Sequence, residues 1–228
     1  MNMIKLYSSS RRKAADPDEL EELFFVLEHF YLYSEKQHYR KMKQMQKHIL
    51  QRYPDFCAPP SLAMPQVLAW TRFCAGICRG GKTIYQYFLE HHLPKLNLTL
   101  SPFTEFMLTE WQYVFPGFYY PSISVGTTGR LFEAEDMFNG ELKTVIAFNQ
   151  TFTPPEKGTI MTGLLLPLGD GRFTPVLDLL QVHPSDRNKA AGDLSAYAHS
   201  DPSLYFDQLA VSDYPEFLHI LLRHLKSH

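Results

Sequence analysis

The sequence has little cysteine, with only Cys57, Cys74 and Cys78 in 228 residues and no C-x-x-C pair. An odd number of cysteines leaves one thiol over in any disulfide scheme, which excludes a disulfide scaffold and favours a reducing compartment. The ten histidines form no set with these cysteines at the spacing of zinc ligands. We therefore expect free thiols and neither a metal nor another cofactor.

Long apolar runs are also missing. No segment approaches the roughly 20 apolar residues of a membrane span, and the first residues lack the apolar region of a signal peptide. These absences predict a cytoplasmic protein with no membrane contact. The formal net charge is only −2, which argues against a general polyanion binder, while 45% hydrophobic and 14% aromatic residues are ample for a folded core.

The first half of the chain has the pattern of helices. Asp16 and Glu19 flank Pro17 as a capping box, and apolar residues then recur at helical spacing to about Tyr53, with a possible break near Ser34. Further helices are expected over 64–79, 83–92 and 101–115. The residues before Asp16 include a Ser-Ser-Ser-Arg-Arg-Lys run that is typical of a loose tail.

After Pro116-Gly117 the apolar period changes from 3.6 to about 2, which indicates antiparallel strands. Strands are expected over 118–125, 130–137, 142–148, 159–168 and 172–183, with a type I′ hairpin at Asn139-Gly140. Five short strands favour a small antiparallel SH3-like or OB-like barrel, because closure removes exposed edges. A polar linker over 184–192 then precedes C-terminal helices beginning after Asp201-Pro202 and at Asp213. The predicted fold is α+β, with a helical domain at 1–116, a barrel at 117–184, and a linker with helices at 185–228.

One motif in the helical half carries a chemical meaning. Residues 76–83, Gly-Ile-Cys-Arg-Gly-Gly-Lys-Thr, match the phosphate-loop pattern G-x-x-x-x-G-K-[ST], in which Gly76, Gly81, Lys82 and Thr83 would hold a nucleotide. A phosphate loop follows a buried strand, whereas Trp70, Phe73, Cys74 and Ile77 have helical spacing. We interpret the segment as a turn between two helices, in which Thr83 and Gln86 form a capping box.

Charge is distributed unevenly along the chain. Residues 36–52 hold six bases and no acid, and Arg40, Lys43 and Lys47 share one helix face. The predicted barrel is locally acidic, which opposes the positive groove that single-stranded nucleic acid needs. Nucleic-acid or ribosome binding through the basic helix is therefore an alternative function, with Arg40, Lys43 and Lys47 as the candidate surface.

Several segments together resemble a bacterial family of unknown function. They are Gly81-Lys-Thr-Ile-Tyr-Gln-Tyr-Phe-Leu89, Leu100-Ser-Pro102 with Trp111, Asp136-Met-Phe-Asn-Gly-Glu141, Lys157-Gly-Thr-Ile160 and Leu166-Pro-Leu-Gly-Asp-Gly171. The resemblance covers roughly residues 65–184 and implies a helical segment before a small β-barrel. Many members of that family carry a cysteine-rich SEC-C zinc motif, which this sequence lacks.

No catalytic motif accompanies these features. There is no G-x-S-x-G nucleophile elbow, and Glu133, Glu135 and Asp136 are best read as solvated strand charges. We expect binding in place of catalysis, with a protein partner favoured and an aromatic patch at the helix–barrel junction as its candidate surface. The members of that patch are Phe118, Tyr119, Tyr120, Phe132 and Phe138. A nucleotide-binding enzyme is a second alternative, an active site gathered from distant loops stays open, and the oligomeric state is not indicated.

Overall fold

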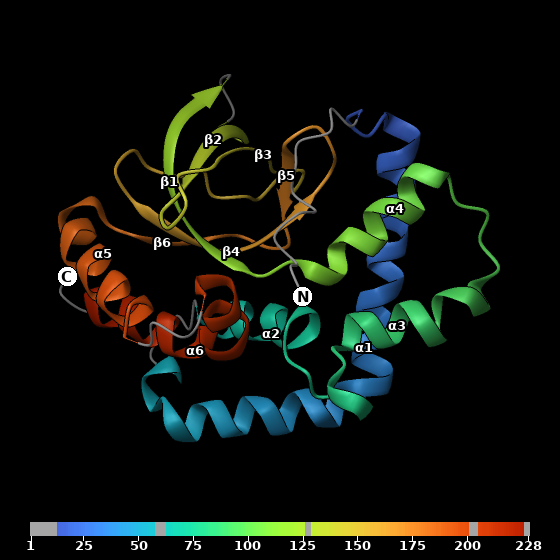
Figure 1. The fold of residues 1–228 in the computed structure, drawn as a ribbon, viewed down its shortest axis with the longest axis horizontal. Helices are drawn as coiled ribbons and strands as arrows, with labels where there is room; N and C mark the ends of the chain where they lie inside the picture. The colour runs from blue at the N-terminus through green and yellow to red at the C-terminus, as the bar shows by residue number, and fades with distance from the viewer. Residues whose placement is uncertain (1–12, 58–62, 126–128, 201–204, 226–228) are drawn as a thin grey trace.

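The fold is taken from a computed structural model, which describes residues 13–57, 63–125, 129–200 and 205–225. Helices α1 to α4 come first, then strands β1 to β6, then α5 and α6 (Figure 1). The helices are α1 (Pro17–Arg52), α2 (Ala63–Phe73), α3 (Ile84–His91), α4 (Pro102–Glu110), α5 (Arg187–Ala198) and α6 (Phe206–Leu225). The strands are β1 (Pro116–Val125), β2 (Leu131–Asp136), β3 (Leu142–Ile146), β4 (Ile160–Pro167), β5 (Arg172–Pro175) and β6 (Leu180–Val182). The α+β prediction is confirmed, while the predicted tail lies in residues 1–12, outside the described ranges.

Helix α1 begins as the sequence predicts. The Asp16 carboxylate accepts from the Glu19 N–H at 3.0 Å, and the Glu19 carboxylate accepts from the Asp16 N–H at 2.9 Å. The helix is continuous through the predicted break at Ser34, but Figure 1 shows that it changes direction part-way along. The Ser34 hydroxyl donates to the Tyr31 carbonyl at 2.8 Å, a serine contact of the kind that bends helices. Its first half therefore lies along one edge of the molecule and its second half along another.

Helix α2 ends at Phe73, earlier than the predicted end at 79. The N–H groups of Cys74 and Ala75 both bond to the Trp70 carbonyl, at 2.8 and 3.1 Å, which closes the last turn. Residues 74–83 are consequently a connection to α3, and Cys74 and Cys78 lie in this connection. Both are free thiols.

Helix α2 is buried on nearly all sides, and its polar side chains are paired with other parts of the fold. Nine of its eleven residues are buried. The Gln66 amide donates to the Asp178 carbonyl between β5 and β6 at 2.6 Å, and the Arg72 guanidinium donates to Ser34 of α1 at 3.0 Å. The Trp70 indole donates to the Val211 carbonyl of α6 at 2.7 Å. Burial of these groups is tolerated because each has a partner.

The Val211 carbonyl needs an outside donor because of Pro215. In a regular helix it would accept from the N–H of residue 215, and proline has none. Helix α6 is indeed kinked here, with non-helical dihedral angles at Asp213. The two C-terminal helices expected on either side of Asp213 are thus two parts of α6, and Trp70 supplies the missing donor. The start signal Asp201-Pro202 lies outside the described residues.

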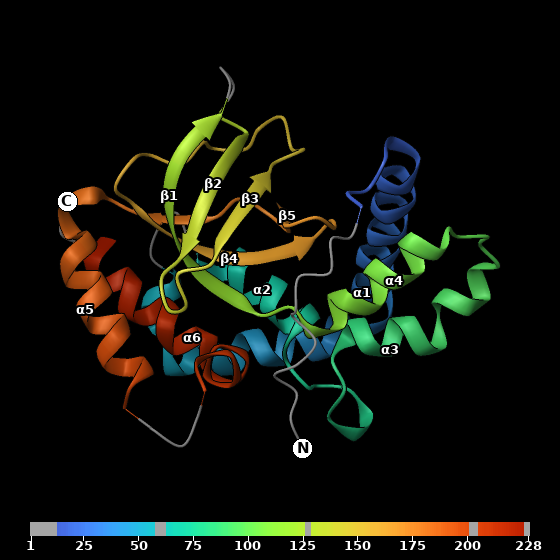
Figure 2. The same ribbon diagram turned by 45° about the horizontal axis from the view of Figure 1, so that its top comes forward.

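The strands form a closed barrel in the order β1-β2-β3-β5-β4, with β4 returning to β1 (Figure 2). All neighbours are antiparallel except β3 and β5, which are parallel. The expected purely antiparallel arrangement is therefore wrong in this detail. A closed ring with an odd number of strands cannot alternate direction throughout, so at least one parallel pair is required. Of the two predicted barrel types, this connectivity is that of an OB-type barrel.

The last predicted strand is divided in two. Strand β5 pairs with the end of β4, and β6 pairs with its beginning, from Ile160↔Val182 to Thr162↔Leu180. The turn at 139–140 also differs from the predicted type I′ hairpin, because only Gly140 has a positive φ there (69°). Instead, the buried Asp136 carboxylate accepts from the N–H groups of Phe138 and Asn139, which closes a longer turn.

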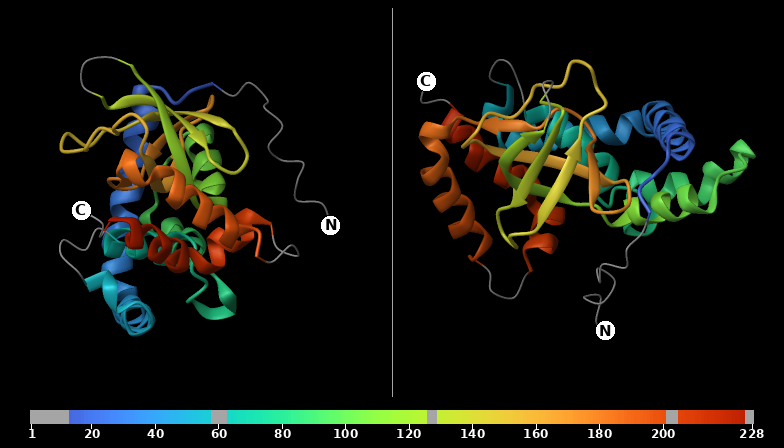
Figure 3. Two further views of the ribbon diagram at one scale, coloured as in Figure 1. Left: turned by 90° about the vertical axis from the view of Figure 1, so that its left-hand side faces the viewer. Right: turned by 90° about the horizontal axis from the view of Figure 1, so that it is seen from above.

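One hydrophobic core spans the three segments of the chain. It contains Phe30 of α1, Phe118 of β1, Leu164 of β4 and Phe217 of α6, and the views in Figure 3 place the barrel on one side of the helices. A smaller cluster fills the barrel interior. The predicted linker at 184–192 is mostly helical, since α5 begins at Arg187. The buried Ala190, Leu194 and Ala198 of α5 recur at i, i+4, i+8, which is the spacing of one helix face.

Replacing Trp70 with Phe is expected to lower the free energy of unfolding by about 1–3 kcal/mol, because the Val211 carbonyl then has no donor. The loss should shrink in a Pro215→Ala background, where residue 215 supplies an N–H. Urea unfolding of the unmodified protein, Trp70→Phe, Pro215→Ala and the double variant measures the two losses of stability. Tyr113→Phe, at an exposed ring, is the control. Equal losses in both backgrounds would contradict the assignment.

Candidate functional site on helix α1

The segment with the phosphate-loop pattern lies between two helices. Its glycines are required by the backbone of the turn. Gly80 and Gly81 have positive φ angles of 76° and 74°, and a Cβ at Gly76 would lie 2.5 Å from the Gly81 carbonyl oxygen. The Cys78 N–H bonds to the Lys82 carbonyl at 2.9 Å, and the Gly81 N–H bonds to the Cys78 carbonyl at 3.1 Å. These donors are therefore not directed at a ligand, as the backbone of a phosphate loop requires.

Lys82 and Thr83 are also engaged. The Lys82 ammonium pairs with the Glu90 carboxylate at 2.6 Å on the surface of α3. The Thr83 hydroxyl accepts from the Gln86 N–H at 3.0 Å, while the Gln86 side chain accepts from the Thr83 N–H, which is the predicted capping box. These contacts support the interpretation of residues 76–83 as a structural turn.

Titration with Mg-ATP is expected to show no binding, either for the unmodified protein or for Lys82→Ala, since the four motif residues serve the turn. Isothermal calorimetry at protein concentrations above 0.1 mM, roughly a hundred times a micromolar Kd, would detect even weak association. Micromolar affinity that disappears in Lys82→Ala would contradict this interpretation of the motif.

The same turn carries a buried thiol beside an imidazole. The Cys78 Sγ lies 3.7 Å from the His38 Nδ1, and the His38 Nε2 lies 3.1 Å from the Tyr33 hydroxyl. Burial raises the pKa of Cys78 and lowers the pKa of His38, and nearby Lys41 adds to the lowering at His38. Thiol and imidazole are both held neutral, whereas a nucleophilic cysteine is a thiolate. The cluster fastens the turn to α1, and sequence spacing could not reveal it because its members are 40 positions apart.

The pKa shift of His38 makes stability depend on pH. Its pKa is lowered in the folded state, so the unfolded chain, with a histidine pKa of about 6.5, binds the proton more tightly. Stability should therefore fall as pH decreases through 6.5 toward the folded-state value, and His38→Gln should remove that part of the loss. Urea unfolding between pH 8 and 5 tests this, with the exposed His48→Gln as control. Identical pH slopes for His38→Gln and the unmodified protein would contradict it.

The predicted basic residues are brought together on one face. Arg40, Lys43 and Lys47 are exposed on the second half of α1, and Lys36 extends their row at the spacing i, i+4, i+7, i+11. The Lys43 ammonium lies 5.6 Å from the centre of the Tyr39 ring. Within the described ranges, none of the four cations has a carboxylate within 4.0 Å. We call this row the basic stripe.

The barrel offers little to a nucleic acid. On OB-type barrels, strands 2 and 3 carry the usual binding face. Here the residues of that face include Glu133 and Glu135, with Thr144 and Leu142 directly opposite them on β3. Carboxylates repel phosphates, and a face of this composition has no aromatic ring for stacking a base.

The expected aromatic patch is mostly core. Phe118, Tyr119 and Phe132 are buried, and Phe138 stacks on Phe206 of α6 with ring centres 3.7 Å apart. The ring of Tyr120 lies 4.1 Å from the Arg187 guanidinium. Phe118, Tyr120 and Phe138 join the barrel to the C-terminal helices, while Tyr119 and Phe132 lie in the barrel interior. The five side chains therefore form no common apolar surface for a partner.

A hollow on the first half of α1 is a candidate binding site. It has a volume of about 350 Å³, is open to solvent, and lies against the loop that leads into α4. Its lining consists of Asp18, Glu21, Glu22, Phe25, Leu98, Thr99 and Leu100. Phe25 is 45% exposed and Leu98 is 36% exposed, so an apolar floor is available beside three carboxylates. We call this feature the acidic hollow.

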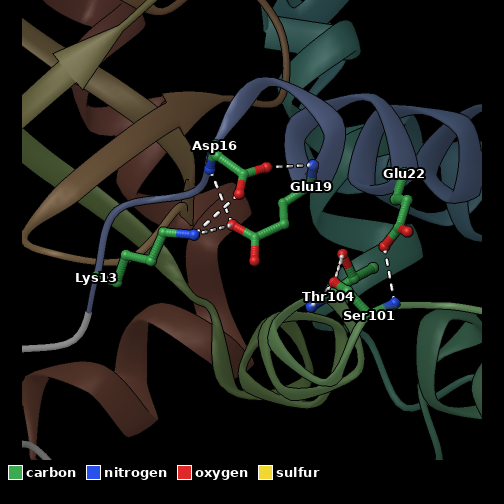
Figure 4. Close-up of polar contacts among 6 residues, drawn as sticks. All are labelled: Lys13, Asp16, Glu19, Glu22, Ser101 and Thr104. Atoms are coloured by element: carbon green, nitrogen blue, oxygen red, sulfur yellow. Dashed lines mark hydrogen bonds and ion pairs between the residues drawn. The ribbon is translucent and has the colours of Figure 1, made fainter.

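Hydrogen bonds hold one wall of the acidic hollow in place (Figure 4). The Glu22 carboxylate accepts from the Ser101 N–H at 3.0 Å, and the Ser101 hydroxyl accepts from the Thr104 N–H at 3.1 Å as the cap of α4. Hydrogen bonds from Thr104 and Ser101 lower the pKa of Glu22, which keeps its negative charge. The loop and α1 thus form one fixed surface.

In the described part of the chain, some of the carboxylates around the start of α1 form ion pairs and others do not. The Lys13 ammonium lies 2.9 Å from Asp16 and 3.6 Å from Glu19, and neither of these carboxylates lines the hollow (Figure 4). Asp18 and Glu21, which line the hollow, are exposed, and no cation lies within 4.0 Å of them among the described residues. The hollow therefore keeps its negative potential. Sequence reasoning missed it because its two walls are far apart along the chain.

Two other kinds of site, a metal centre and a membrane-spanning helix, are absent from the described parts of the chain. These parts hold no group of three or more histidine, cysteine or acidic side chains placed to bind a metal ion. They also hold no helix long and apolar enough to cross a bilayer.

No family model, no curated protein and no solved structure matches this chain. The resemblance to the SEC-C-associated bacterial family consequently stays a prediction.

Proposed function

We propose that this chain is a non-catalytic binding protein whose partner is a protein segment that docks in the acidic hollow. The observation that supports it is the lining of the hollow, where exposed Phe25 and Leu98 stand beside Asp18, Glu21 and Glu22. An exposed apolar surface with a charged rim is the usual composition of a protein interface. The carboxylates select a basic segment and disfavour a nucleic acid.

The shape of the hollow also favours a protein over a small molecule. Pockets for small ligands enclose most of the ligand surface, whereas this hollow is open along α1. A helix laid beside α1 could place apolar side chains on Phe25 and Leu98 and its cations near Asp18 and Glu21. We further propose a reducing, cytoplasmic location, which suits the free thiols Cys74 and Cys78.

Selection from a displayed library of random 16-residue peptides tests the proposed site without a known partner. We expect enriched peptides that combine Lys or Arg with apolar residues at helical spacing, because those groups complement the hollow. Fluorescence anisotropy of a selected peptide should show at least tenfold weaker binding to Phe25→Asp, about 1.4 kcal/mol or more.

Leu142→Asp is the matched control for this experiment, since Leu142 is an exposed leucine on the barrel, away from the hollow. The variant should bind the selected peptides as well as the unmodified protein does. Three results would contradict the proposal: no enrichment, enrichment of acidic peptides, or equal binding to Phe25→Asp and Leu142→Asp.

A further inference from the structure

Helix α1 is divided by charge into two halves. Residues 17–35 contain six acids and no lysine or arginine, and residues 36–52 contain six bases and no acid. The acidic hollow lies on the first half and the basic stripe on the second. One helix therefore presents a negative surface and a positive surface of comparable strength.

The two surfaces match in length and periodicity as well as in charge. Asp18, Glu21, Phe25 and Glu28 are spaced i, i+3, i+7, i+10 and span about 15 Å, while the four cations of the basic stripe span about 16 Å. Both rows average about 3.5 residues per turn, which is the period at which two helices stay in contact side by side. An antiparallel helix pair would bring carboxylates of one row against cations of the other.

Exposed apolar side chains follow the same face. Phe25, Leu32 and Tyr39 recur every seven residues and are 45%, 61% and 51% exposed. Large apolar side chains left in solvent at a heptad spacing are typical of a helix that pairs with another helix. The basic stripe with Tyr39 thus has the chemistry that the acidic hollow selects, namely cations beside an exposed ring.

The stripe cannot occupy the hollow of its own molecule. Both belong to the continuous helix α1, whose two halves lie along different edges of the fold (Figures 1 and 3). The second half is also tied down at its end, where the Tyr53 hydroxyl donates to Glu216 at 2.6 Å and Arg52 lies 3.3 Å from the same carboxylate. A basic stripe that reaches the hollow must come from another molecule.

We propose that the partner of the acidic hollow is the basic stripe of a second copy of this chain. This inference rests on the proposed function of the hollow and names its occupant. In the contact, Glu21 and Glu28 of one copy lie against Lys43 and Lys36 of the other, and Phe25 packs beside Tyr39. The attraction is between exposed charges, so it weakens as salt is added.

Charge reversal in two separate variants tests the pairing. The acid-reversed variant is Glu21→Lys with Glu28→Lys, and the base-reversed variant is Lys36→Glu with Lys43→Glu. Sedimentation velocity of the unmodified protein should show concentration-dependent association in about 0.05 M salt that decreases in about 0.5 M salt. Each variant alone should sediment as a monomer, because the residues proposed to pair, 21 with 43 and 28 with 36, then carry like charges.

An equimolar mixture of the two variants is the decisive sample. The lysines introduced at positions 21 and 28 in the first variant then face the glutamates introduced at positions 43 and 36 in the second, so both ion pairs are restored with their signs exchanged and the mixture should associate again. Two controls change net charge equally at other sites: Glu133→Lys with Glu135→Lys on the barrel, and Lys157→Glu with Lys189→Glu. Both control variants should associate like the unmodified protein.

Three results would overturn the proposal. They are an unmodified protein that stays monomeric at every concentration, a mixture that does not associate, and a control variant that loses association. If the first occurs while selected peptides still bind the hollow, the proposed function stands and only the second copy is excluded. Tight binding of a labelled 20-nucleotide oligouridylate to a monomer, lost in the base-reversed variant, would assign the stripe to nucleic acid instead.

Discussion

The fold depends on the burial of helix α2. A helix enclosed on nearly all sides removes its polar side chains from water, and each must find a partner within the protein. Gln66 finds one between β5 and β6, Arg72 on α1 and Trp70 on α6, so α2 determines where these elements lie relative to one another. The hydrophobic core supplies most of the stabilisation, and these hydrogen bonds select one arrangement of it.

Closure of the sheet into a barrel constrains the directions of its strands. Five strands in a ring require a parallel pair, and here the β4–β5 hairpin brings β5 alongside β3 in the same direction. In this arrangement β4 has three neighbouring strands. It pairs with β1 along one edge and with both β5 and β6 along the other. Strand β4 is accordingly buried along almost its whole length, and it is the strand against which α2 packs.

Local signals in the sequence were sufficient for much of this fold. The capping boxes at Asp16 and Thr83 and the change of apolar period at Pro116 predicted helix starts and the onset of the sheet correctly. The end of α2 was missed because backbone bonds to Trp70 close the helix before the apolar pattern stops. The hollow and the Cys78–His38 contact could not be predicted, since each joins segments that only the tertiary fold brings together.

The dependence of α6 on Trp70 also bears on how the chain acquires its fold. The two partners of that hydrogen bond are 141 positions apart. Of the helices that pack against α2, α6 is the last to be synthesised. During synthesis, the apolar surface of α2 emerges long before the helix that covers it. Contacts of such separation form slowly, because the loop between them must first close. The nascent chain therefore exposes the apolar surface of α2 while the intervening residues are synthesised, and α6 then protects that surface from aggregation.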